Sequence, residues 1–212
     1  MIDVPGAQAH YEVARERLGL DPQQDAEAAW HLARLLHERR DLLQVRDPTT
    51  LKPQFQSRPC AVLAPGQGGI QQVQALPSGT PLIVAGSAVA RARDHDLTPR
   101  LVVTDLDGDP GAHLTLSRWG ATTAIHAHGD NTQLIDELVP RFQGPVLATC
   151  QTTPPKDAPA PVHRFGGFTD GDRAVWLAAW LGASEVWLAG WDLEEEGVDG
   201  VKREKLAIAG EM

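Results

Sequence analysis

Short apolar runs rich in β-branched residues alternate along this chain with stretches of helical or turn-rich composition. Such alternation predicts strands joined by right-handed crossovers, and therefore an α/β fold with a mostly parallel sheet and helices on both faces. The expected strands are Cys60–Ala64, Leu82–Ala85, Leu101–Thr104, Thr122–His128, Val146–Thr149 and Val186–Ala189. The expected helical or turn-rich segments between them are Gly69–Leu76, Ser87–Asp94, Thr132–Arg141 and Asp172–Leu181.

A helical segment is expected before the first strand. Residues 7–45 have helical composition, and Asp21 followed by Pro22 supplies an N-cap and a first-turn proline. This segment would cover the core or a partner subunit. The proline-rich stretch 47–59 is typical of a linker. We therefore expect an N-terminal helical segment and linker over 1–58 and an α/β catalytic domain over 59–212.

The composition excludes several classes of protein. A formal net charge of −9 argues against a general nucleic-acid binder and against a polybasic membrane surface. Cys60 and Cys150 have no metal-ligand spacing and are too few for a disulfide framework, so we expect buried free thiols. No signal-like segment begins the chain, and no apolar run reaches the ~20 residues that span a bilayer. A cytoplasmic protein is expected.

Acidic residues follow the expected strand at 101–104. Ligands of parallel α/β sheets bind beyond the carboxyl ends of the strands. Asp105 and Asp107 are two residues apart and would share one face of an extended chain, where they could hold one cation. Mg²⁺ typically takes one or two carboxylates together with phosphate oxygens and water. The alternative is an Asp-Gly turn with solvated acids, and we favour the metal.

A histidine pair ends the next expected strand. His126 and His128 alternate across one alanine and would share a face, followed directly by Asp130 and Asn131. Zinc would need a third ligand that no cysteine or histidine spacing supplies. We expect contacts to phosphate or substrate from these residues, with helix capping as the alternative for Asp130 and Asn131.

Glycine-containing loops could hold phosphate groups at the same edge. Gly66 lies in a loop between an expected strand and helix, where backbone N–H groups could cradle phosphate or simply form a tight turn. Thr169 and Asp170 precede a helix beside Arg173, which suits an anion, although either residue could instead be an N-cap. Further along, Lys202 and its neighbours form a basic face that is either solvated or near a triphosphate.

Taken together, these motifs resemble those of the archaeal 6-hydroxymethyl-7,8-dihydropterin pyrophosphokinases, a family similar to thiamine pyrophosphokinase in fold and chemistry. The resemblance runs from about residue 60 to the end. It is carried by Val103–Gly108, His126–Asn131, Thr149–Thr152, Gly166–Arg173, Leu188–Asp192 and Lys202–Leu206. One departure is the loop Ala64–Gly69, which replaces the Gly-x-Gly-Pro-Ser-Leu type of turn expected in the family.

The resemblance implies Mg²⁺-dependent transfer of a diphosphoryl group from ATP to a reduced pterin, giving AMP and the pterin diphosphate. The product would serve the biosynthesis of methanopterin- or folate-type carriers, and a homodimer is possible. The residues implied as catalytic are Asp105, Asp107, His126, His128, Asp130 and Arg173, with Asp105, Asp107 and Asp130 on the metal. Those implied to bind ATP or pterin are Gly66, Gly86, Ser87, Gly108, Asn131, Gln151, Thr169, Asp170, Asp172, Asp192, Lys202 and Lys205.

Three other readings compete with this one. The sequence Asp105-Leu-Asp-Gly also resembles the first motif of haloacid-dehalogenase-type phosphatases, but that motif normally opens the domain and here about a hundred residues precede it. Sugar-nucleotide-dependent glycosyltransferases of a related fold carry similar strand-end acids. Thiamine pyrophosphokinase usually adds an all-β domain, for which the chain after Asp192 is too short. Product identity separates these alternatives.

Overall fold

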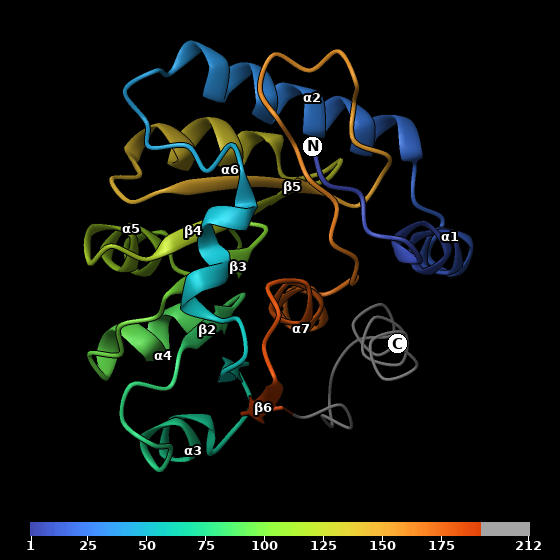
Figure 1. Ribbon diagram of the computed structural model, residues 1–212. Helices are drawn as coiled ribbons and strands as arrows, with labels where there is room; N and C mark the ends of the chain where they lie inside the picture. Colours follow the sequence, from blue (N-terminus) through green and yellow to red (C-terminus); the bar gives the residue numbers. More distant parts are fainter. Residues whose placement is uncertain (192–212) are drawn as a thin grey trace.

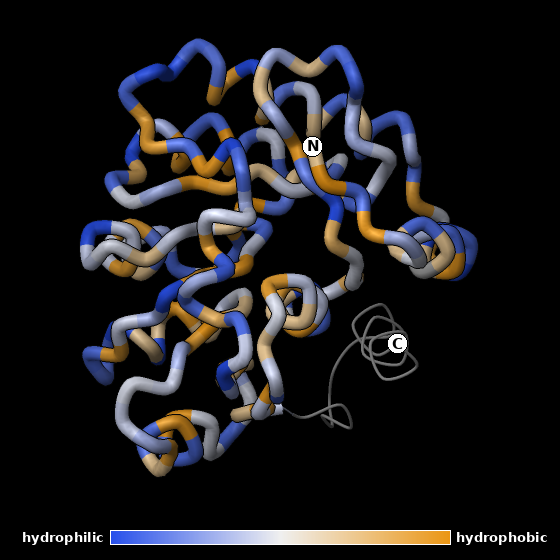
Figure 2. The backbone as a smooth tube through the Cα atoms, in the orientation of Figure 1, coloured by the Kyte–Doolittle hydropathy of each residue, from blue (hydrophilic) through white to orange (hydrophobic). Residues whose placement is uncertain are grey.

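The computed structural model describes residues 1–191, whose strands form one parallel sheet in the order β5-β4-β3-β2-β1-β6 (Figure 1). The predicted α/β class is confirmed. Apolar residues lie along these strands, while hydrophilic segments occupy many of the outer turns (Figure 2). The strands are β1 (Pro59–Leu63), β2 (Leu82–Ala85), β3 (Leu101–Thr104), β4 (Thr122–Ala127), β5 (Val146–Cys150) and β6 (Glu185–Ala189).

Alternate residues of each central strand pack into two different cores, as expected for a sheet that is covered on both faces. In β1, Cys60 and Val62 join one core, whereas Ala61 and Leu63 join the other. The first core also contains residues of α7 (Asp170–Trp180) and of the 3₁₀ helix η1 (Pro48–Gln54). The second contains residues of α3 (Gly69–Gln74), α4 (Ala88–Asp94) and α5 (Pro110–Arg118).

The N-terminal helices belong to the same body as the sheet. They are α1 (Ala7–Leu18) and α2 (Pro22–Glu38), and Asp21 caps α2 by accepting a hydrogen bond of 2.9 Å from the Gln23 N–H. Together with α6 (Thr132–Leu138) and the 3₁₀ turn η2 (Val139–Arg141), α2 shares a core with β4 and β5 (Figure 1). The division at residue 58 therefore stays a prediction.

The stretch expected to be a linker is part of the core. It contains η1, and the side chains of Leu51 and Phe55 are buried in the core that also holds residues of β1 and α7. The cysteine prediction is confirmed, since Cys60 and Cys150 are buried free thiols. Burial raises the pKa of Cys60 to about 11 and that of Cys150 to about 12. Within residues 1–191, no helix has the length and apolar character needed to cross a membrane.

Candidate active site

The predicted site residues within 1–191 lie at the carboxyl edge of the sheet, because parallel strands all end on the same side. β3 continues into the turn Asp105–Asp109, and its neighbour β4 continues into His128–Asn131. The first turn of α7 lies against the end of β2, where a side chain at Gly86 would come within 3.0 Å of Asp170 Oδ2. Residues far apart in sequence thus share one site.

The turn after β3 is stabilised by hydrogen bonds from its own side chains, and its backbone is strained at one residue. Thr104 Oγ1 accepts a hydrogen bond of 2.8 Å from the Leu106 N–H, and Asp105 Oδ1 accepts one of 3.2 Å from the Asp107 N–H. Leu106 has a φ of 76°, which is costly for a residue with a Cβ. Its side chain is only 1% exposed and packs in the α2–β4–β5 core. Burial of this leucine offsets the strain and fixes the two acids.

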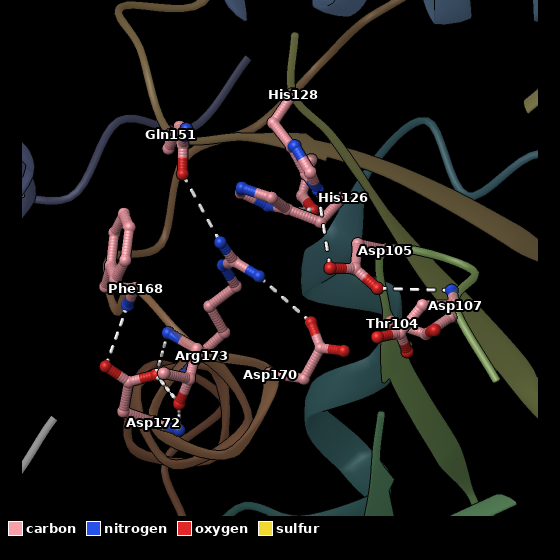
Figure 3. Close-up of polar contacts among 12 residues, drawn as sticks. Thr104, Asp105, Asp107, His126, His128, Gln151, Phe168, Asp170, Asp172 and Arg173 are labelled. Carbon is pink, nitrogen blue, oxygen red and sulfur yellow. Dashed lines mark hydrogen bonds and ion pairs between the residues drawn. The ribbon is translucent and has the colours of Figure 1, made fainter. Parts of the chain in front are cut away.

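Three carboxylates form a group that fits a divalent cation. Oxygens of Asp105, Asp107 and Asp170, hereafter the acid trio, lie within 4.8 Å of one another (Figure 3). Carboxylate oxygens are the hard ligands that Mg²⁺ prefers. The sequence grouped Asp130 with the first two acids, but the Asp130 side chain is 86% exposed and pairs with Nδ1 of His128. Asp170 thus joins the first two acids in the structure, and a metal contact of Asp130 stays a prediction.

Two acids of the trio, Asp105 and Asp170, have opposite pKa shifts. Burial raises the pKa of Asp105, but a hydrogen bond from His128 and the positive charge of Arg173 outweigh it and hold that pKa below its usual range. Burial and the nearby charge of Asp105 raise the pKa of Asp170 to about 8. Without a cation, Asp105 is ionised at neutral pH and Asp170 keeps its proton. A bound cation would favour ionisation of both.

The two histidines have different environments, with ring centroids 6.2 Å apart. His126 lies on β4 facing α7, and its Nδ1 is 3.2 Å from Thr149 Oγ1. Burial lowers the pKa of His126 well below its usual value, so the ring is neutral, and its Nε2 has no hydrogen-bond partner among the described residues. His128 lies just beyond β4, with Nε2 3.3 Å from Asp105 Oδ2.

The first turn of α7 separates a cap from site residues. Thr169 and Asp172 form a capping box, in which Asp172 oxygens accept hydrogen bonds from the N–H groups of Phe168, Thr169 and Arg173. These bonds occupy the Asp172 carboxylate in a structural role. Its predicted substrate contact, like that of Thr169, is not tested by the geometry and stays a prediction.

Arg173 is the buried cation of the site. Its side chain donates hydrogen bonds of 3.0 Å to Asp170 Oδ1 and 3.3 Å to Gln151 Oε1, and the residue is 8% exposed (Figure 3). Its Nε is buried and makes no hydrogen bond to the described residues. A buried guanidinium with an unused donor beside a group of carboxylates suits an anionic ligand such as a phosphate.

Small residues leave room around the acid trio. Gly86 has a φ of 52° and lies against Asp170, and a Cβ at Gly108 would lie 3.4 Å from the Cβ of Ser87. Gly66 is different, because its N–H donates to the Gly190 carbonyl at 2.7 Å and its own carbonyl accepts from Arg91. The Gly66 N–H is thus used within the fold rather than directed at a ligand.

The sequence did not predict the roles of two residues, Asn131 and Asp25. The Asn131 side chain donates to the carbonyls of Asp105 and His126 and accepts from the His128 N–H, so it ties the ends of β3 and β4 together. Asp25 of α2 accepts hydrogen bonds from Gly129 and Gln151, although the sequence assigned this helix to covering the core. An acid at a core-facing helical position, three residues before the buried Ala28, was the available signal.

The remaining predicted residues Asp192, Lys202 and Lys205 lie outside the described residues. A hollow of about 700 Å³ is found at the opposite, amino edge of the sheet, where Arg46, Arg100 and Trp119 are among its lining residues. It is separate from the acid trio, which lies at the carboxyl edge.

Comparison with known proteins identifies relatives of this chain. The profile of a family described as "6-hydroxymethylpterin diphosphokinase MptE-like" matches residues 33–197. A Methanothermobacter thermautotrophicus protein is 35% identical over 180 residues, covering 84% of this chain and 73% of the relative. A Pyrococcus furiosus protein is 37% identical over 187 residues, covering 86% and 74%. A Methanocaldococcus jannaschii protein is 30% identical over 198 residues, covering 90% and 80%. All three are named 6-hydroxymethyl-7,8-dihydropterin pyrophosphokinase.

Proposed function

Because the chain belongs to the MptE-like 6-hydroxymethylpterin diphosphokinase family, we propose that it catalyses diphosphoryl transfer from ATP to 6-hydroxymethyl-7,8-dihydropterin. The pterin hydroxyl oxygen would attack the β-phosphorus of ATP while the bond from that phosphorus to the α,β-bridging oxygen breaks. The hydroxyl proton passes to solvent, and the products are AMP and the pterin methyl diphosphate.

The observation that carries this proposal is the acid trio beside the buried guanidinium of Arg173. Phosphoryl transfers leave little covalent chemistry to the protein, so alignment and neutralisation of charge dominate catalysis. The trio would hold Mg²⁺, which neutralises phosphate charge when bound. Asp130 remains a proposed further ligand, but its ion pair with His128 gives it another role.

The protein's own side chains would orient the phosphates. Arg173 is held by Asp170 and Gln151 with one donor unused, so it can bind a phosphate oxygen without first giving up a partner. The neutral His126 can donate or accept one hydrogen bond through Nε2. His128 lies between Asp105 and Asp130, which fix the position of its ring.

Analysis of the nucleotide product tests the proposal. The purified chain is incubated with ATP, Mg²⁺ and 6-hydroxymethyl-7,8-dihydropterin, with thiamine as the acceptor in a parallel tube. We expect AMP to form only with the pterin and to disappear when a chelator is added. AMP formed with thiamine alone would point to thiamine pyrophosphokinase, and release of inorganic phosphate would point to a phosphatase. An absence of AMP with both acceptors would contradict a pyrophosphokinase.

A further inference from the structure

Asp25 is a buried acid on a helix whose other buried residues serve packing. The residue is 4% exposed, and its helical neighbours Ala28, Ala29 and Leu32 are fully buried in the core shared with β4 and β5. Removing a carboxylate from water is costly unless hydrogen bonds replace the lost water. An apolar residue would fill this position at lower cost, so the carboxylate needs a reason beyond packing.

Three donors from separate parts of the chain satisfy the Asp25 carboxylate. Oδ1 accepts a hydrogen bond of 2.9 Å from the Gly129 N–H, and Oδ2 accepts one of 2.9 Å from Gln151 Nε2 and one of 2.8 Å from the Tyr11 hydroxyl. Gly129 belongs to the loop that carries His128, and Gln151 directly follows β5. Asp25 therefore touches two of the segments that build the site.

The Asp25 carboxylate fixes which way the Gln151 amide faces. The Asp25 oxygens accept hydrogen bonds, and the NH₂ group of Gln151 points toward Asp25 as their donor. The amide oxygen then points the other way and accepts from Arg173 Nη2, while Arg173 Nη1 donates to Asp170 (Figure 3). A continuous series of hydrogen bonds thus joins α2 to the acid trio through Gln151 and Arg173.

We propose that Asp25 is a positioning residue of this site, acting through Gln151 to hold the Arg173 guanidinium in place for the phosphates. The inference rests on the proposed function, because it assigns Arg173 to the reacting phosphates. It makes the N-terminal helices part of the catalytic unit instead of a cover over the core. Asp25 itself touches neither substrate nor metal.

Steady-state kinetics of Asp25→Asn, Tyr11→Phe, Gln151→Ala and the Asp25→Asn/Gln151→Ala double variant test this role. Asp25→Asn keeps the size of the side chain but removes its charge, and we expect kcat to fall at least tenfold while KM for ATP changes less than twofold. Tyr11→Phe is the matched control, because it removes one donor to the same carboxylate but leaves the bonds to Gln151 and Gly129. Its kcat should stay within twofold of the parent, even where its melting temperature falls.

The double variant separates positioning from general destabilisation. If Asp25 acts through Gln151, Asp25→Asn combined with Gln151→Ala should lose less activity than the product of the two single losses. Multiplied losses would overturn the proposal, and so would an Asp25→Asn enzyme as active as Tyr11→Phe. The parent enzyme serves as the reference in both comparisons. If it formed no pterin diphosphate, the proposed function would fail, whatever the variants did.

A measurement without substrate tests the same contact independently of activity. The Nε–Hε resonance of Arg173, assigned with Arg173→Lys, reports the environment of the guanidinium in a ¹H–¹⁵N spectrum. It should shift or broaden in Asp25→Asn and remain unchanged in Tyr11→Phe. An unchanged resonance in Asp25→Asn would show that Asp25 does not position Arg173.

Discussion

The turn after β3 and the first turn of α7 contain acids at alternate positions, but only some of these acids face the site. In the first turn, Asp105 and Asp107 join the acid trio while Asp109 caps α5 by accepting from the Ala112 N–H. In the second, Asp170 joins the trio while Asp172 caps α7. An acid whose oxygens meet the N–H groups of a helix start is occupied there. The backbone path, and not the spacing of the acids, separates the acids of the trio from the helix caps.

The two turns also differ in charge. Asp105 is kept ionised by His128 and Arg173, whereas Asp170 is buried beside Asp105 and keeps its proton until the pH reaches about 8. Asp105 therefore carries a negative charge in the metal-free protein, and Asp170 would become charged if a bound cation displaced its proton. The site thus combines an acid that is ionised at neutral pH, Asp105, with one that is protonated, Asp170.

The largest expected effect is the loss of the Asp105 carboxylate. Asp105→Asn removes a trio carboxylate and the partner of His128, and we expect kcat to fall on the order of a hundredfold or more. Asp109→Asn is the control, because asparagine caps helices about as well as aspartate and the ion pair with Arg93 is partly exposed to solvent. Steady-state AMP formation measures both. Equal activity of the two variants would contradict the different roles assigned to Asp105 and Asp109.

A smaller effect should separate the two acids of α7. Asp170→Asn should lower kcat at least tenfold with little loss of stability, because the buried carboxyl is already neutral at pH 7. Asp172→Ala breaks the capping box and should lower the free energy of unfolding by about 1–2 kcal/mol. It should also retain a larger share of activity than Asp170→Asn. Urea unfolding and AMP assays are made on both variants. A larger loss of stability in Asp170→Asn and a larger loss of activity in Asp172→Ala would contradict the roles assigned to these acids.

The last comparison concerns the pH dependence of stability and leaves the activity of the parent unchanged. In chelator-treated protein, the unfolded chain releases the Asp170 proton near its ordinary pKa of 3.8, whereas the folded protein holds that proton up to about pH 8. Stability contributed by Asp170 is therefore present below about pH 4 and lost progressively as the pH rises to about 8, by at most about 1.4 kcal/mol per pH unit. The unfolding free energy of the parent minus that of Asp170→Asn, measured at pH 6, 7 and 8, should fall. A constant difference would contradict the raised pKa.

The fold could be predicted because strands buried on both faces leave continuous apolar runs in the sequence. The acids after β3 could be predicted because a parallel sheet brings its strand ends to one edge. The start of α7 was placed two residues late, at Asp172, because the capping box that begins the helix at Asp170 depends on a backbone path that spacing alone does not specify. The sequence thus indicated that Asp170 and Asp172 lie near the site, but not that the first joins the trio and the second caps α7.

Asp25 could not be predicted as a site residue. Its contacts with Gly129 and Gln151 span 104 and 126 positions of the chain, and no local pattern records such distances. The apolar stripe around it gives the correct helix and the correct buried face. Its partners become apparent only when α2 is packed against the ends of β4 and β5.

The separation of the trio along the sequence also bears on synthesis of the chain. Asp105 and Asp107 emerge from the ribosome well before Asp170, and Arg173 follows later still. Domains fold from the N-terminus as they are made, and contacts between distant residues form late. An unfinished chain that ends before α7 therefore lacks the third carboxylate and the guanidinium. We therefore expect a chain that is truncated before α7 to be inactive.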